Sequence, residues 1–364
     1  MGDRVTEAVV LVGGRGTRLR PLTIDTPKPM LPTAGVPFLL HLLARIRDAG
    51  VDHVVLATSY RPEVFARGIG DGASLGLRID YVNEDQPLGT GGGIRNVAPM
   101  LVSLPDDPVV ILNSDILSSH DIAAQVEAHV ASAADVSMHL TEVHDPRAFG
   151  CVPTDANGRV TAFLEKTPEP VTNYINAGCY VFTRRLIDEI PAGRAVSVER
   201  ETFPGLLRDG ALVLGFADSG YWLDVGTPET FVRGSCDLVL GRLASSVLPG
   251  PTGESLVLPG AQVADGAVLS GGTTAGAGAV VCAGARVDGS VLLDGAVVGE
   301  GAVVRGSVLG RDSRVGARSH LVGVMVGDRA QVGDDNELLA GARVWADVRL
   351  PDRSVRFSSD EPSA

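Results

Sequence analysis

From about residue 250 to the end of the chain, aliphatic side chains recur at every sixth position. The residues in phase are Val257, Val263, Leu269, Ala275, Val281 and Val287, then Val291, Val297, Val303, Leu309, Val315 and Leu321, then Val326, Val332, Leu338 and Val344. A period of six fits neither an α-helix nor an alternating strand, and it is typical of a hexapeptide-repeat β-helix. We therefore expect a C-terminal left-handed β-helix over residues 246–364, with roughly five coils of about 18 residues.

Residues 1–245 instead alternate short apolar runs with helical patterns. The strand-like runs are Ala8–Val12, Val54–Thr58, Leu77–Val82, Val109–Leu112 and Val136–Thr141, and the helical patterns are Phe38–Ala49, Pro62–Ile69, Gly91–Met100 and Asp121–Ser132. This alternation predicts a Rossmann-like α/β domain with a mostly parallel sheet, joined to the β-helix by a Pro- and Gly-rich linker near residues 241–256. Ligands of such sheets bind beyond the carboxyl ends of the strands, so the loops there should carry the chemistry.

The net charge and the cysteines indicate which kinds of partner and which compartment to expect. The formal net charge is −13, which argues against nucleic acid as a partner. No apolar run approaches the roughly 20 residues of a membrane span, and the first run is too short for a signal peptide. The four cysteines form no C-x-x-C pair. We expect reduced thiols, a cytoplasmic location and no membrane partner.

The first chemical motif is Leu11–Thr23, which reads LVGGRGTRLRPLT. Glycines after a buried strand let the backbone approach a ligand closely, and amides in such a turn can cradle phosphate oxygens. The spacing matches neither the dinucleotide fingerprint nor a P-loop. We expect nucleotide contacts from Leu11, Gly13, Gly14, Gly16, Thr17 and Arg18.

A lysine and two aspartates complete the candidate centre. Of 31 basic residues only Lys28 and Lys166 are lysine, and prolines flank Lys28 in TPKPMLP. These prolines are expected to hold the backbone extended and to aim the ammonium at a phosphate. Asp115 follows a buried strand, and Asp224 lies in a second loop with Gly226. Mg²⁺ prefers carboxylate oxygens together with substrate phosphates, so this pair is a candidate Mg²⁺ site.

Taken in order, these motifs resemble the sugar nucleotide pyrophosphorylase family of nucleotidyltransferases. The further matching segments are Val82–Asn96 (VNEDQPLGTGGGIRN), Leu112–Asp115 (LNSD), Phe163–Lys166 (FLEK), Ile175–Gly178 (INAG) and Tyr221–Glu229 (YWLDVGTPE). Thr167 replaces the proline that usually follows the FLEK-type element. The match spans residues 8 to about 230. It implies Mg²⁺-dependent transfer of a nucleotidyl group to a sugar 1-phosphate, with release of pyrophosphate.

The resemblance also implies roles for individual residues. Arg18, Lys28, Asp115 and Asp224 would be catalytic, and the two aspartates would bind the metal. Glu84, Gly89 and Thr90 would contact the base, and Gly150, Glu165, Lys166 and Asn176 would bind the sugar phosphate.

Glu84 favours guanine. Relatives that use pyrimidines commonly carry a glutamine there, whereas a carboxylate can accept both adjacent donors of guanine. The competing interpretation is a shifted register that leaves Glu84 or Asp85 as a solvated surface charge. The expected use of GTP, the sequence LGTGGG and the short β-helix are features in which this chain resembles the family members that act on mannose 1-phosphate. The alternatives are glucose 1-phosphate with dTTP, UTP or ATP, and a non-catalytic regulatory paralogue.

The β-helix raises two further possibilities. Such coils often host acyl transfer, which needs a catalytic histidine, and His320 is the only histidine of the repeat region. Their flat faces and open ends also favour symmetric pairing, so we expect a homo-oligomer assembled through the β-helix.

Overall fold

The computed structural model describes residues 7–356, which group into two compact units. Residues 7–14 and 42–222 form the sheet unit, and residues 15–41 and 223–356 form the β-helix unit. The predicted division at residue 245 follows the chain, whereas this grouping moves residues 15–41 to the unit of the C-terminal region. The Gly-rich loop is therefore split between the units after Gly14.

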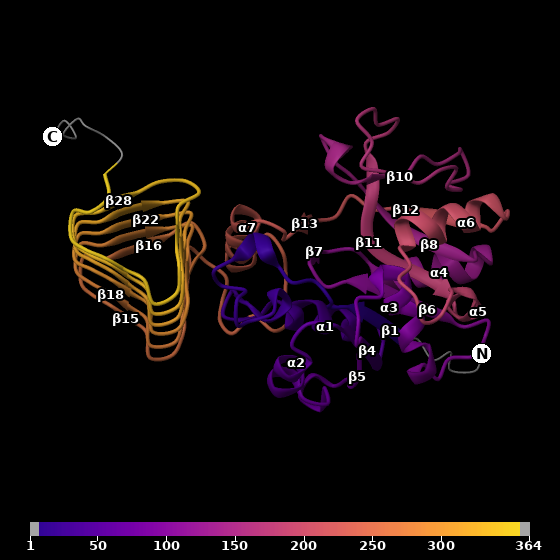
Figure 1. The fold of residues 1–364 in the computed structure, drawn as a ribbon, viewed down its shortest axis with the longest axis horizontal. Helices are drawn as coiled ribbons and strands as arrows, with labels where there is room; N and C mark the ends of the chain where they lie inside the picture. The colour runs from indigo at the N-terminus through magenta and orange to yellow at the C-terminus, as the bar shows by residue number, and fades with distance from the viewer. Residues whose placement is uncertain (1–6, 357–364) are drawn as a thin grey trace. The chain divides into compact units, whose positions relative to one another are not determined.

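A nine-stranded sheet forms the centre of the sheet unit (Figure 1). Its strands are β1 (Glu7–Leu11), β4 (His53–Thr58), β5 (Arg78–Asn83), β6 (Pro108–Asn113), β8 (Val136–Glu142), β9 (Gly150–Cys151), β10 (Leu164–Glu165), β11 (Tyr174–Thr183) and β12 (Val213–Ala217). The main path runs β10-β9-β11-β6-β1-β4-β5, and β8 joins β11 to β12. The predicted Rossmann-like sheet is confirmed, with all five expected strands present.

The sheet is mixed: the expected parallel strands are present, and β11 runs against its neighbours. Strands β6, β1, β4 and β5 are parallel, but β11 is antiparallel to both β6 and β8. The reason is the connection into β11. The chain arrives from the short β9–β10 ladder through irregular residues 166–173, and no crossover helix forces a parallel return.

The helices of this part of the chain are α1 (Phe38–Asp48), α2 (Pro62–Ile69), α3 (Gly89–Val97), α4 (Ile122–Ser132), α5 (Arg184–Glu189) and α6 (Phe203–Arg208). A short strand, β7 (Ile116–Ser118), follows β6. Fully buried aliphatic residues of the strands, such as Val9, Val55 and Ile111, pack with Ile94 of α3 in one core. Burial of this apolar surface fixes the loops at the strand ends.

The β-helix unit contains three parallel sheets, consistent with the predicted left-handed β-helix (Figure 1). The first holds β14 (Ser255–Val257), β17 (Thr273–Ala275), β20 (Val291–Leu292), β23 (Val308–Leu309), β26 (Met325–Val326) and β29 (Arg343–Val344). The second holds β15 (Gln262–Val263), β18 (Val280–Val281), β21 (Val297–Val298), β24 (Arg314–Val315), β27 (Gln331–Val332) and β30 (Arg349–Leu350). The third holds β16 (Val268–Ser270), β19 (Arg286–Asp288), β22 (Val303–Arg305), β25 (His320–Val322) and β28 (Glu337–Leu338).

The phase of the six-residue repeat needs one correction. Leu292, Val298 and Val304 join the buried core, instead of the in-phase Val291, Val297 and Val303. Strand pairings such as Val281 with Val298 show that coils can be 17 residues long, one fewer than a strict sixfold repeat gives. Each such coil shifts the inward position by one residue.

Four further elements lie next to the signature loops in the sequence. They are β2 (Pro32–Thr33), β3 (Val36–Pro37), β13 (Trp222–Asp224) and α7 (Pro228–Val239). In the described part of the chain, residues 7–356, we find no helix with the length and apolarity needed to cross a bilayer.

Candidate active site

The Gly-rich turn and the Asp115 loop leave the sheet at the same edge. Strand β1 pairs in parallel with β6, with Leu11 opposite Asn113. Gly13 follows the first strand, and Asp115 follows the second. The Ser59 hydroxyl donates to the Gly13 carbonyl at 2.8 Å, and a Cβ on Gly13 would lie 2.7 Å from that Oγ. A side chain at Gly13 would displace the Ser59 hydroxyl, so glycine keeps this bond and presents a bare backbone beside the loop that carries Asp115.

Glu84 is fixed in the loop between β5 and α3. Its amide donates to the Thr58 carbonyl at 2.8 Å, and one carboxylate oxygen accepts from the Leu88 amide at 3.2 Å. The other carboxylate oxygen lies 2.7 Å from the place where a Cβ on Gly93 would be. Burial raises the pKa of Glu84, although the Leu88 amide acts in the opposite direction. This ordered, half-buried carboxylate does not match the interpretation of Glu84 as a solvated surface charge.

Gly89 and Thr90 hold the start of α3. Gly89 has φ 69°, and a Cβ there would lie 2.6 Å from the Val196 carbonyl oxygen. The Thr90 hydroxyl donates to Glu199 at 2.8 Å and accepts from the Val198 amide at 2.9 Å. Because these bonds occupy the hydroxyl, Thr90 chiefly joins α3 to the segment that carries Glu199.

The predicted sugar-binding residues come together on three strands. Glu165 of β10 pairs with Gly150 of β9, and its carboxylate lies 3.0 Å from the place of a Cβ on Gly150. Lys166 has φ 49° and places its ammonium 3.7 Å from the Glu165 carboxylate. The Lys166 side chain remains 63% exposed, so it can reach a phosphate. On β11, Asn176 donates from Nδ2 to the Tyr180 hydroxyl at 2.6 Å.

Sequence reasoning missed Tyr180 and Glu199 at this place. Burial raises the pKa of Tyr180 well above its usual value, and the charge of Glu199 adds to the effect. Tyr180 is fully buried and orients Asn176. Glu199 belongs to a single π-helical turn, Val198–Thr202, whose sequence resembles an ordinary exposed charged run. Only the fold reveals that this turn returns to α3.

In the β-helix unit, the two cations that the sequence analysis expects at the phosphates lie beside two glycines. Gly16 has φ 58°, and its Cβ would lie 2.9 Å from the Lys28 Cβ. A Cβ on Gly226 would lie 2.6 Å from Nη2 of Arg18 and 3.1 Å from Oδ1 of Asp224. The structure thus brings Arg18 and Asp224 together beside the bare Cα of Gly226, and it places Lys28 against the Gly-rich loop.

The expected extended backbone at Lys28 is wrong. Lys28–Met30 form a 3-10 turn, closed by bonds from the Met30 amide to the Pro27 carbonyl and from the Leu31 amide to the Lys28 carbonyl. Pro29 fits the second position of this turn because its missing N–H has no partner to lose there. The turn keeps the predicted rigidity with a different backbone shape.

The residues expected to bind Mg²⁺ offer hard oxygen donors that suit this cation. Both aspartates are half-buried at the ends of strands, and Thr227 caps α7 just beyond Asp224. They belong to different units, Asp115 to the sheet unit and Asp224 to the β-helix unit.

Another cluster of possible metal ligands proves to be a hydrogen-bonded core. Among the described residues, the ligand atoms of His120, His139 and Asp218 lie within 4.8 Å of one another. Both ring nitrogens of His120 are already bonded, to Asp218 at 3.0 Å and to Gln125 at 2.6 Å. The two rings stack with centroids 3.7 Å apart, and burial lowers the pKa of both histidines. Because both of its ring nitrogens are engaged, His120 has no lone pair left for a cation.

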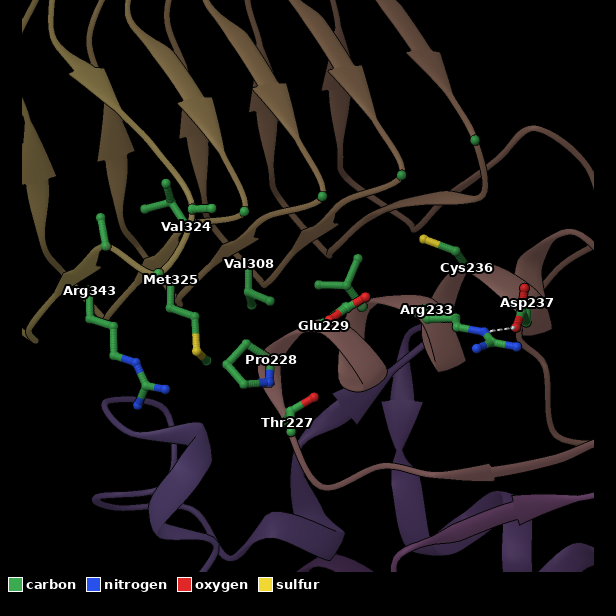
Figure 2. Close-up of a pocket in the computed structure, with 18 of the residues that line it drawn as sticks. Thr227, Pro228, Glu229, Arg233, Cys236, Asp237, Val308, Val324, Met325 and Arg343 are labelled. Atoms are coloured by element: carbon green, nitrogen blue, oxygen red, sulfur yellow. Dashed lines mark ion pairs between the residues drawn. The ribbon is translucent and has the colours of Figure 1, made fainter. Parts of the chain in front are cut away.

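A cavity of about 740 Å³ opens within the β-helix unit, between α7 and one corner of the coils (Figure 2). Thr227, Pro228 and Glu229 border it directly after the Asp224 loop. Val308, Val324, Met325 and Arg343 approach from the β-helix side.

Comparison with known families identifies both parts of the chain. Residues 7–239 match the family model described as nucleotidyl transferase. The chain belongs to the nucleotidyl transferase family. Residues 252–360 match a second model, described as the GMPPB C-terminal domain.

Individual members of the nucleotidyl transferase family are similar over most or all of the chain. A mannose-1-phosphate guanylyltransferase of Mycobacterium tuberculosis is 55% identical over 361 residues, covering 99% of this chain and 100% of that protein. The mannose-1-phosphate guanylyltransferase catalytic subunit beta of Drosophila melanogaster is 36% identical, covering 71% of each chain. The crystal structure of HddC from Yersinia pseudotuberculosis complexed with GMP-PN has a TM-score of 0.55 and 28% identity, covering 63% of this chain and 97% of that one.

Proposed function

We propose that this nucleotidyltransferase transfers GMP from GTP to mannose 1-phosphate, giving GDP-mannose and pyrophosphate. The main support is the 55% identity over nearly the whole chain to a mannose-1-phosphate guanylyltransferase. Glu84 supports the choice of base, because an ordered carboxylate can accept both the N1–H and the 2-amino group of guanine. The sugar is assigned through the relatives.

The reaction asks the protein for positioning and charge stabilisation. An oxygen of mannose 1-phosphate attacks the α-phosphorus of GTP, the bond to the β-phosphate breaks, and pyrophosphate leaves in line. The attacking phosphate is already ionised near neutral pH, so no general base is needed. Lys28 stabilises the α-phosphate, and Arg18 with the amides of the Gly-rich turn holds the leaving pyrophosphate. Asp115 and Asp224 would hold Mg²⁺, which would supply neutralisation of the phosphate charge.

The sugar side uses residues whose geometry leaves donors and acceptors available. Lys166 holds the phosphate of mannose 1-phosphate, and Glu165 accepts from sugar hydroxyls. Asn176 uses one N–H on Tyr180 and accepts from the Gly178 amide, so it keeps a second N–H for a hydroxyl. The Gly150 backbone lies beside Glu165 and completes this set.

A pyrophosphate-release screen tests the proposal. GTP, UTP, dTTP and ATP are each combined with mannose 1-phosphate and glucose 1-phosphate, with Mg²⁺ and with EDTA. We expect the highest kcat/KM for GTP with mannose 1-phosphate, and no turnover in EDTA. Preference for glucose 1-phosphate with another triphosphate would overturn the substrate assignment, and turnover with no pair would favour a regulatory paralogue.

We also propose a homo-oligomer that assembles through the first coil of the β-helix. Val257 and Val263 occupy inward positions, yet they are 46% and 40% exposed, whereas the equivalent Ala275 and Val281 of the next coil are at most 1% exposed. Strands β14, β15 and β16 end their three sheets in the described chain, and between Ser255 and Gly272 the only charged residue is Asp265. Solenoid ends normally need a polar cap, and uncharged edge strands invite pairing, so a second copy suits this end.

Light scattering of a Val257→Asp/Val263→Asp variant tests this assembly. Two buried carboxylates should dissociate the oligomer, and Val322→Asp, at a 40% exposed site on another coil, is the matched control. An unchanged mass would contradict the proposal. A location in the cytoplasm is a further proposal, supported by four free cysteines of which Cys151, Cys179 and Cys236 are buried.

A further inference from the structure

The segment that carries the phosphate-binding motifs is held by the β-helix. Residues 15–41 group with residues 223–356, and they include both the Gly-rich loop after Gly14 and the TPKP turn. Nη1 of Arg343 donates to the Arg20 carbonyl at 2.8 Å. Nη1 of Arg311 lies 3.5 Å from the Thr26 hydroxyl. The sequence places these partners more than 280 residues apart, as separations of 323 and 285 show.

Each contact lies two residues from a proposed catalytic cation. Arg20 follows Arg18, and Thr26 precedes Lys28. Thr17–Leu19 form a single 3-10 turn, in which the Leu19 amide donates to the Gly16 carbonyl at 2.9 Å and the Arg20 amide donates to the Thr17 carbonyl at 3.3 Å. The Thr23 hydroxyl also donates to the Gly16 carbonyl at 2.8 Å, so the bond from Arg343 to the Arg20 carbonyl adds an outside anchor to a single short turn that carries Arg18.

The β-helix side of this contact is itself rigid. Pro21, which follows Arg20 in the loop, is buried, and its Cγ lies 3.0 Å from the place where a Cβ on Gly327 of the β-helix would be. That Cβ would also lie 2.6 Å from the amide nitrogen of Ala346. Arg311 is fixed by its ion pair with Asp328 at 3.5 Å, and the Arg311 amide donates to the same carboxylate at 2.8 Å. The coils beneath are closed by parallel ladders and a buried aliphatic column. The loop therefore rests on a surface that cannot move independently of the coils.

We propose that the last coils of the β-helix position the phosphate-binding loop for catalysis, with Arg343 as the principal positioning residue and Arg311 as the second. This inference rests on the proposed function, because it assigns Arg18 to the leaving pyrophosphate. Figure 2 shows Arg343 extending from the β-helix at the end of the cavity. The β-helix thus serves turnover within each subunit, in addition to the assembly role proposed for its first coil.

The proposal predicts different kinetic effects for the nucleoside triphosphate and for the sugar 1-phosphate. Loss of the Arg343 anchor lets the Arg18 turn shift, and misplacement by about 1 Å can cost about 100-fold in rate. The residues proposed to bind the sugar belong to the sheet unit, whereas Arg343 and the loop that it anchors belong to the β-helix unit. We expect Arg343→Ala to lower kcat/KM for the nucleoside triphosphate by about tenfold and to leave KM for the sugar 1-phosphate unchanged.

The experiment compares Arg343→Ala, Arg343→Lys and Arg349→Ala in the full chain. Lysine can still donate to a carbonyl, so Arg343→Lys should recover part of the lost activity. Arg349 is an exposed arginine on the neighbouring sheet and serves as the matched control. Hydrogen exchange of peptides covering residues 15–30 should be faster in Arg343→Ala alone. The substrate pair is the best one found in the wild-type screen, so failure of the GTP or mannose assignment is recognised separately from failure of this proposal.

Three outcomes would overturn it. Wild-type kinetics in Arg343→Ala would show that the anchor is dispensable. An equal loss in Arg349→Ala, or a fall that accompanies a lower unfolding temperature or a changed oligomer mass, would show a general structural effect. A change confined to KM for the sugar 1-phosphate would place the effect at the wrong substrate.

Discussion

The sheet unit and the β-helix unit carry different parts of the proposed chemistry. Glu84, Glu165 and Asn176, which are proposed to recognise base and sugar, lie on loops and strands of the sheet unit. Arg18 and Lys28, which are proposed to neutralise the triphosphate, lie in the unit with the coils. Recognition residues are held by a conventional buried sheet, whereas the cations depend on a segment anchored by arginines of the repeat. Selectivity and turnover should therefore respond to different substitutions.

The largest effect is expected at Lys28. Lys28→Arg keeps the charge but replaces a compact ammonium by a planar guanidinium, and the Lys28 Cβ already packs against Gly16. Loss of one aligned phosphate contact should lower kcat by about two to three orders of magnitude. Single-turnover kinetics measure the effect, and Lys166→Arg, in the sheet unit, gives the comparison: it should raise KM for the sugar 1-phosphate more than it lowers kcat. Near-normal kcat in Lys28→Arg would remove Lys28 from the mechanism.

The two units also differ in how far their sequences predict them. The six-residue repeat predicts the coils, and the alternation of apolar runs predicts each strand from β1 to β8 that carries a site loop. Local patterns do not predict β11 as antiparallel, because its direction follows from the irregular path of residues 166–173. Local patterns also cannot show that Arg343 bonds to Arg20, because the sequence around either residue contains no signal for a contact with the other. Glu199 was missed for the same reason: its partner Thr90 lies 109 residues away.

The second prediction uses an ion pair confined to the sheet unit. Burial acts to raise the pKa of Glu7, but bonds from His53, Ser103 and Val102 outweigh it and lower the pKa to about 2. The bond to Glu7 raises the pKa of His53, against burial. Glu7→Gln removes the carboxylate from a fully buried site and should lower the free energy of unfolding of this unit by about 2 kcal/mol at pH 7.

The direction of the two pKa shifts determines how the free energy of unfolding changes with pH. The folded-state pKa of Glu7 lies below the ordinary value of 4.5, so its contribution is complete above pH 4.5 and is lost as the pH falls toward 2. The contribution of His53 is complete below pH 6.5 and is lost as the pH rises through its raised folded-state pKa. Trp222 lies in the sheet unit and Trp345 in the β-helix unit, so a Trp345→Phe background isolates the first in fluorescence-monitored urea unfolding. An acid slope that survives Glu7→Gln would exclude Glu7 as its source.

The third prediction concerns the preference for one base over another, and not the rate of the chemical step. Glu84→Gln exchanges a carboxylate for an amide that can donate as well as accept, which suits uracil or thymine better than guanine. The ratio of kcat/KM for GTP to that for UTP should fall about tenfold, equivalent to about 1.4 kcal/mol. Asp85→Asn, an exposed neighbour, should leave the ratio unchanged. An unaltered ratio in Glu84→Gln would show that the base is read elsewhere.

The smallest effect compares two coils inside the β-helix unit. Val298 is fully buried in the aliphatic column, whereas Val263, at the same place in the first coil, is 40% exposed. Val298→Ala leaves a void between adjacent coils and should cost about 1 kcal/mol more than Val263→Ala in dissociated subunits. Urea unfolding followed by Trp345 fluorescence in a Trp222→Phe background measures both. In the assembled protein the gap should narrow as the concentration rises, because a second copy that covers Val263 would make its truncation costly as well. A concentration-independent gap would mean that the first coil stays open to solvent, and it would leave the exposed valines without the partner proposed for them.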